Sequence, residues 1–141
     1  FETLKVKELE FTKIIKENIL KENDFLEKLF EYFAFILKNK EKIFIDARKI
    51  MFESIHLYLH PKYKEEMKSY ESTFSDMYKI IEDIFDDEMK KGFLKEDSKE
   101  SIKIILATVD GMYYHSLILS NYNLRKTVTD YLIQTTNQLK K

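Results

Sequence analysis

Apolar side chains recur every three or four residues along most of the chain, which is the spacing of one face of an α-helix. Similar stripes predict helices over about 2–21, 25–38, 41–59, 62–91, 97–120 and 124–141. The stripe in the fourth of these helices is the clearest. Its seven positions are Met67, Tyr70, Phe74, Met77, Ile81, Ile84 and Glu88, and all of them except Glu88 are apolar. We therefore expect an all-α fold, a six-helix antiparallel bundle.

Polar residues and helix breakers lie between the predicted helices. Asp24 is suited to cap the second helix, and Asp97 or Ser98 is expected to cap the fifth. Gly92 stands where a residue in the left-handed conformation would end the fourth helix. The chain has 141 residues with only two glycines and one proline, which fits a single domain of long helices with few tight turns.

The charge balance argues against a chain that binds nucleic acid by itself. The sequence has 24 basic and 25 acidic residues, and Arg48 and Arg125 are its only arginines. Phosphate and base-edge recognition favour arginine, so we expect no direct contact with DNA. The sequence contains no cysteine, which excludes disulfides and thiol chemistry and fits a reducing compartment such as the cytoplasm. No apolar run approaches the length of a membrane span, so no membrane partner is expected.

One stretch of the chain carries a family resemblance. The segment 83–94 ends at a glycine followed by apolar residues, and after it come Asp97 and the run 107–111, which holds an Asp-Gly pair. This order resembles the C-terminal half of TetR/AcrR-type transcriptional regulators, in which a long helix ends at such a turn and an Asp-led helix follows. Residues 47–53 and Pro61 resemble the third regulatory helix of that family and the turn after it.

The resemblance implies one ligand-binding and dimerisation domain over residues 1–141, taken from a transcriptional repressor. In that family the last two helices form a four-helix bundle with their mates, and the other helices enclose a pocket for a small, often hydrophobic molecule. Filling the pocket moves the first helix, which carries a helix-turn-helix head. That head is not included in this sequence, so DNA is expected to be a partner only of the parent protein.

The last two predicted helices carry residues that favour a two-fold homodimer. Some of them are small, so two helices can approach closely. Others are large and apolar but lie off the main stripes, so they would be exposed in a monomer. The expected interface is Ile104, Ala107, Thr108, Gly111, Ile118 and Ile133.

We expect a mostly apolar pocket between the predicted helices 41–59, 62–91 and 97–120. Methionine adapts to ligands of varied shape, and tyrosine and histidine add a few orienting hydrogen bonds. No arginine falls in the lining stretches, so we expect an uncharged or weakly charged hydrophobic or aromatic effector and no cofactor. The expected lining residues are Phe52, His56, Phe74, Met77, Tyr78, Val109, Met112, Tyr113 and His115. The alternatives are a solid core made of the same side chains, and a plain surface role for His115.

Two further functions compete with the regulatory one. Glu53, His56 and His60 lie on one helical face at spacings of three and four, which can seat a metal ion in a helical-bundle enzyme. However, the sequence has no second ligand set, and a histidine near a helix C-terminus is favoured by the helix dipole alone. We therefore expect no metal and no catalytic residues. The other alternative is a structural helical module that only mediates protein contacts.

Overall fold

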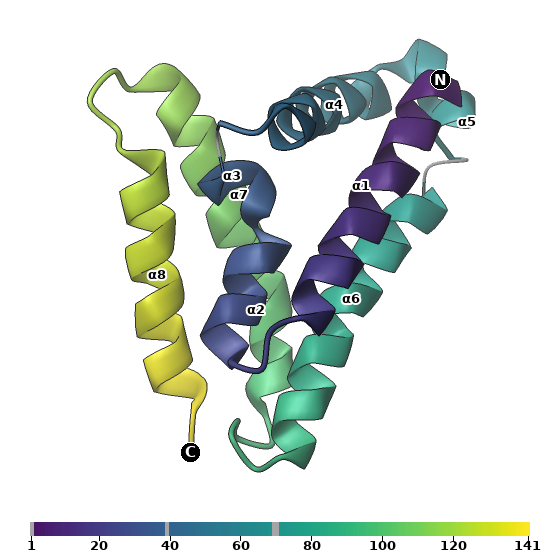
Figure 1. The fold of residues 1–141 in the computed structure, drawn as a ribbon. Coiled ribbons are helices and arrows are strands. Elements are labelled where there is room, and N and C mark those ends of the chain that lie inside the picture. The colour runs from purple at the N-terminus through teal and green to yellow at the C-terminus, as the bar shows by residue number, and fades with distance from the viewer. Residues whose placement is uncertain (1, 39, 69–70) are drawn as a thin grey trace.

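The computed structural model describes the backbone of residues 2–38, 40–68 and 71–141, and the side chains of 6, 9–38, 40–50, 59–65, 68 and 75–141, Val6 and Leu9 among them. Over these residues the protein is all-α, as the periodicity predicts (Figure 1). The α-helices are α1 (Glu2–Leu20), α2 (Phe25–Tyr32), α3 (Ala34–Leu37), α4 (Lys42–Leu59), α5 (Lys64–Met67), α6 (Glu71–Lys90), α7 (Ile102–Ile118) and α8 (Leu124–Leu139). The 3-10 helices η1 (Pro61–Tyr63) and η3 (Ser98–Ser101) lie in the connections between them.

The segment formed by α2 and α3 runs through the middle of the molecule (Figure 1). Helices α1 and α6 pack against α2 on one side and α8 packs on the other, while α4 crosses next to α3. The sequence of this segment suits a central position, because residues 32–37 are all apolar or aromatic. Every one of them is buried. The ring of Phe25 meets that of Phe85 on α6 edge to face, with 5.2 Å between centroids, a favoured aromatic geometry.

Two of the predicted helices are divided in the structure. The expected helix 25–38 breaks at Phe33, whose ψ of 24° lies outside the helical range. A continuous helix would leave part of this apolar run on an outer face, whereas the break lets α3 pack against both α4 and α8. The expected helix 62–91 is divided into η1, α5 and α6. Its first turn follows Pro61, and the Nδ1 atom of His60 accepts the N–H of Lys62 at 3.2 Å.

The expected start of α2 and the expected end of α6 are confirmed. Asp24 accepts the backbone N–H of Glu27 at 3.2 Å. Gly92 has a φ of +78°, which other residues rarely adopt. Around it, the N–H groups of Gly92 and Phe93 donate to the carbonyls of Met89 and Glu88, both at 3.0 Å. These two hydrogen bonds form a Schellman motif.

The expected cap of the fifth helix is wrong. Neither Asp97 nor Ser101 makes a side-chain cap hydrogen bond. The chain forms the 3-10 turn η3 first, and this turn moves the start of α7 to Ile102. Ser98 is buried instead, and its hydroxyl has no partner within the described part of the chain.

A buried ion pair joins α2 to α6. The Nζ atom of Lys28 lies 2.9 Å from Oε1 of Glu88, and the two side chains are only 9% and 4% exposed. Lys91 approaches the same oxygen at 3.5 Å. The backbone carbonyl of Glu88 also accepts the N–H groups of Phe93 at 3.0 Å and of Leu94 at 3.3 Å. Glu88 therefore holds α2 and the turn after α6 at the same time.

The end of the chain is fixed to that turn. Leu94 and Lys140 form an isolated antiparallel bridge. The N–H of Lys95 donates to the carbonyl of Leu139 at 2.9 Å, and the N–H of Lys141 donates to the carbonyl of Phe93 at 2.9 Å. These backbone hydrogen bonds join the C-terminal end of α8 to the connection between α6 and η3.

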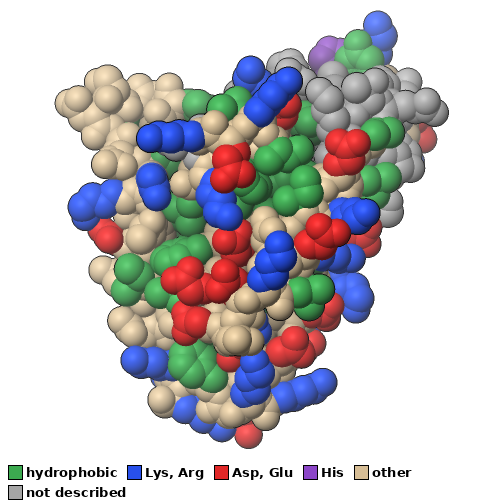
Figure 2. All heavy atoms as spheres, in the orientation of Figure 1, with side chains coloured by type: hydrophobic (Ala, Val, Ile, Leu, Met, Phe, Trp, Pro, Cys, Tyr) green, Lys and Arg blue, Asp and Glu red, His purple; other side chains and the backbone are tan. Residues whose placement is uncertain are grey.

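Acidic and basic side chains are interspersed over the face of the molecule seen in Figure 2. This mixture agrees with the near-zero net charge of −1. None of the helices in the described ranges has both the length and the apolar character needed to cross a membrane.

We expect Glu88→Ala to lower the free energy of unfolding by about 3–5 kcal/mol, because it leaves the Lys28 ammonium buried without its counter-charge. Equilibrium unfolding in urea, followed by circular dichroism, measures this loss.

The exposed pair Lys126–Asp130, with 2.6 Å between its charged atoms, supplies a matched control. Asp130→Ala should cost less than about 1 kcal/mol, because solvent screens this pair. The double variant Lys28→Met/Glu88→Leu should recover most of the stability lost in Glu88→Ala, since it removes both charges together. Equal losses for Glu88→Ala and Asp130→Ala would contradict the central role of the buried pair.

Candidate functional site

Three of the nine residues predicted to line a pocket pack against the core from α6 and α7. Met77, Met112 and Tyr113 are partly buried and packed against the core, and Tyr78 is exposed at its edge. Val109, a fifth predicted residue, is fully buried within the core cluster.

The other predicted pocket residues are placed differently. The side chains of Phe52, His56 and Phe74 lie outside the described residues. His115 is exposed near the end of α7, with its ring 6.4 Å from that of Tyr122 in the α7–α8 connection. His115 therefore lies toward that connection, whereas Val109 faces the core.

Tyr32 belongs to the same region, although the sequence analysis did not select it. It is 3% exposed, and its hydroxyl donates to the backbone carbonyl of Met77 at 3.1 Å. Burial raises the pKa of Tyr32 above its ordinary value, and the nearby Asp110 and Tyr78 raise that pKa further. Tyr32 is thus a neutral hydrogen-bond donor at physiological pH. The signal in the sequence is a single hydroxyl beginning the apolar run 32–37.

Asp110 brings a negative charge to this group from the middle of α7. Asp110 as a whole residue is solvent-exposed. Its carboxyl group is nevertheless partly shielded from water, and this desolvation raises the pKa of Asp110. Two phenols and a carboxylate, from Tyr32, Tyr78 and Asp110, therefore lie close enough to interact electrostatically.

The candidate metal ligands are not brought together among the described side chains. Glu53 and His56 lie outside those side chains. His60 is exposed, and its Nδ1 atom is occupied by the N–H of Lys62. The described residues contain no group of three histidine, aspartate or glutamate side chains that would hold a metal ion.

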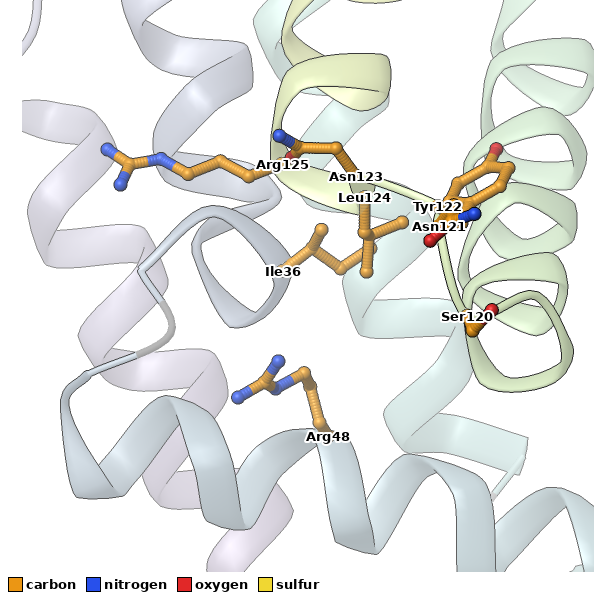
Figure 3. A pocket seen from close by; sticks show the side chains of 8 residues that line it. All are labelled: Ile36, Arg48, Ser120, Asn121, Tyr122, Asn123, Leu124 and Arg125. Carbon is orange, nitrogen blue, oxygen red and sulfur yellow. The ribbon is translucent and has the colours of Figure 1, made fainter.

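A cavity of about 460 Å³ lies between α3, α4 and the connection from α7 to α8 (Figure 3). None of the nine predicted pocket residues is among its lining residues, which are Ile36, Arg48, Ser120, Asn121, Tyr122, Asn123, Leu124 and Arg125. Sequence reasoning missed this cavity because helical periodicity says nothing about which helices a connecting loop will meet. The signal that was present is the pair of arginines, which are the only two in the chain.

One flank of α7 is apolar and exposed. Ile104, Tyr114 and Ile118 are 66%, 60% and 64% exposed. Ala107 and Gly111 lie between them at helical spacing, and a Cβ atom added at Gly111 would meet nothing within 4 Å. We call these five residues the α7 flank.

The other residues of the predicted interface adjoin the α7 flank or lie on the neighbouring helix. Thr108 is half-buried next to Ala107 on α7. Ile133 is exposed on α8, which packs along α7. Tyr114 was not among the predicted interface residues. Its exposure on α7 adds it to them.

Comparison with known proteins gives no match among family models, curated proteins or solved structures. What indicates a function for this chain is therefore its own surfaces and the sequence resemblance.

We expect Asp110→Asn to raise the melting temperature at pH 7 and to leave it unchanged at about pH 3. The pKa of Asp110 is raised in the folded state, so its contribution to stability is full below the unfolded pKa of about 3.9 and is lost as the pH rises through the folded value. Asparagine resembles the protonated form and removes that loss. Thermal unfolding of both proteins at a series of pH values measures the difference.

Asp87→Asn is the matched control, because Asp87 is exposed on α6. A gain at pH 7 that is equal in the two variants would reflect net charge alone and would overturn the assignment to Asp110.

Proposed function

We propose that this chain is the regulatory domain of a TetR-type transcriptional repressor. In this proposal it forms a homodimer through α7 and α8, binds a small hydrophobic or aromatic effector, and transmits binding to a DNA-binding head carried before α1 in the parent protein. The main support for this proposal is the exposed α7 flank, which is suited to contact a second copy of the chain. The same helix carries the Asp110-Gly111 pair that resembles the family.

The composition of α7 supports a helix covered on more than one side. Ile102, Ile105 and Val109 are buried against the core, and the α7 flank adds large apolar residues on another side. A helix that is apolar nearly all round is normally buried, and monomeric proteins rarely expose a contiguous apolar patch of this kind without a function. A partner helix would supply the missing cover.

The order of residue sizes along the α7 flank favours a second copy as that partner. Two small residues, Ala107 and Gly111, lie at the centre, and Ile104 and Ile118 lie at the ends. A two-fold axis near the centre lets the two backbones approach closely there, while the larger side chains of each copy pack beyond the small ones. Exposed Lys103 beside the flank fits the polar rim that surrounds an apolar interface centre.

The effector part of the proposal is supported by the group around Tyr32. Met77 and Tyr78 on α6 and Asp110 on α7 lie near its hydroxyl. Helix α1 packs against α2, α4 and α6, so a ligand that changes the spacing of these helices acts directly on α1. The ligand shifts the arrangement only by its difference in affinity for the two states, and a tenfold difference corresponds to about 1.4 kcal/mol.

We expect the protein to sediment as a dimer at micromolar concentration and Ile118→Glu to sediment as a 17.1 kDa monomer. Placing an unpaired carboxylate in an apolar interface should weaken dimerisation by at least about a hundredfold. Leu20→Glu is the control, because Leu20 is an exposed leucine on α1, away from the proposed interface. A wild-type monomer, or equal effects of the two variants, would contradict the dimer.

Gly111→Ala separates dimerisation from folding in the same experiment. The added methyl group meets nothing within the subunit, and replacing a helical glycine should raise subunit stability by about 0.5–1 kcal/mol. In the dimer the same methyl group keeps the two helices apart. A variant that is more stable and also dimerises less tightly is the expected result.

We expect the purified dimer to carry, or to be stabilised against heat by, a small hydrophobic or aromatic molecule. Tyr32→Phe and Tyr78→Phe should each reduce that stabilisation because they remove an orienting hydroxyl. Mass spectrometry of extracted small molecules and thermal-shift measurements with a hydrophobic ligand library test this. A dimer that responds to no such ligand would be a structural interaction module instead.

A further inference from the structure

The cavity beside α4 combines an apolar floor with a polar wall. Ile36, which is almost fully buried, and Leu124 form the apolar part. Arg48 is half-buried on α4 and extends from that helix toward Ile36 and Leu124, while the side chain of Arg125 starts at the opposite rim and points away from the other lining residues (Figure 3). Residues 120–123 form the side that belongs to the α7–α8 connection.

Both arginines of the chain line this one cavity. Within the part of the chain that the structure describes, neither Arg48 nor Arg125 makes an ion pair or a side-chain hydrogen bond, whereas Lys28, Lys99 and Lys126 all have carboxylate partners. The lining residues include no aspartate or glutamate. The guanidinium group of Arg48 thus lies beside a space that offers it no counter-charge, and Arg125 adds a second positive charge at the rim.

The other polar groups of the lining are also suited to donate. The Oδ1 atom of Asn123 is occupied, because it accepts the N–H of Lys126 at 3.1 Å. The NH₂ group of the same side chain can donate hydrogen bonds to a ligand. Asn121 adds a second amide and Ser120 a hydroxyl, both exposed at the cavity. A lining that can donate hydrogen bonds, carries arginine and contains no carboxylate favours a ligand that accepts hydrogen bonds and carries negative charge.

We propose that this cavity binds a small organic anion. The carboxylate or phosphate group of the ligand lies against Arg48 and the donors of residues 120–123, and its apolar body rests on Ile36 and Leu124. Guanidinium binds both kinds of oxyanion through paired hydrogen bonds. The volume of about 460 Å³ lies within the range of roughly 300–1,000 Å³ that is usual for small-molecule sites. The site goes beyond the function proposed above and does not depend on dimerisation.

Isothermal titration with charge-matched probes tests the proposal. Benzoate and phenyl phosphate share one apolar ring and carry the two candidate oxyanions, while benzamide keeps the shape of benzoate without its charge. We expect at least one of the two anions to bind once per chain, and benzamide to bind about tenfold to a hundredfold more weakly. Benzoate binding alone identifies a carboxylate ligand, and phenyl phosphate binding alone identifies a phosphate ester.

Variants locate the binding. Arg48→Gln should weaken the anion about tenfold or more, and Arg48→Lys should restore only part of the loss, because ammonium lacks the paired donors of guanidinium. Arg125→Gln should have a smaller effect because Arg125 lies at the rim. Lys49→Gln, which removes a positive charge from the exposed residue next to Arg48, should leave the affinity unchanged.

Three results would overturn the proposal. They are no binding of either anion up to about 10 mM, benzamide binding equal to that of the anions, and equal losses in Arg48→Gln and Lys49→Gln. Unchanged circular dichroism and melting temperature of the Arg48 variants show that a loss of binding is not a loss of folding. A monomeric protein that still binds the anion would refute the proposed dimer and leave this site intact.

Discussion

The pairing of Lys28 with Glu88 is the contact around which the lower half of the molecule is arranged. A carboxylate at a position as buried as that of Glu88 is tolerated only with a counter-charge, and Lys28 supplies it from α2. The backbone of the same residue receives the N–H groups that end α6. One residue therefore fixes where the central helix lies against α6 and where α6 stops, and the path of the chain into α7 follows from both.

This arrangement explains why the helical stripe of α6 ends on a charged residue. Ile81 and Ile84 are buried against the core by the ordinary hydrophobic pattern. Glu88 continues the same face one turn later, where α2 presents Lys28 instead of an apolar side chain. Buried polar pairs of this kind give less stability than well-packed apolar groups, but they penalise every other alignment of the two helices.

Much of the fold can be predicted from the sequence, because helices are encoded locally. Periodic apolar residues predict the positions of most helices, and Gly92 marks the end of α6 through its positive φ. The break at Phe33 cannot be predicted in this way, because the run 32–37 is apolar throughout and has no periodicity to read. Its conformation depends on which helices surround it in three dimensions.

The candidate sites differ in the same respect. The α7 flank follows from apolar residues that do not fit the stripe of their own helix, so Ile104 and Ile118 can be recognised from the sequence. The approach of Tyr32 to Asp110 and the cavity around Arg48 join residues far apart in the chain. No spacing rule connects them. The packing of the helices brings Tyr32 near Asp110, and the crossing of α4 next to α3 together with the path of the α7–α8 connection forms the cavity (Figures 1 and 3).

The backbone hydrogen bonds between the end of the chain and the turn after α6 also limit how α7 and α8 can move. Sliding one helix along the other by a single residue would break the bonds made by Lys95 and Lys141, whereas tilting the far end of the pair would preserve them. The C-terminal end of α8 is therefore held in register with the turn that leads into η3 and α7.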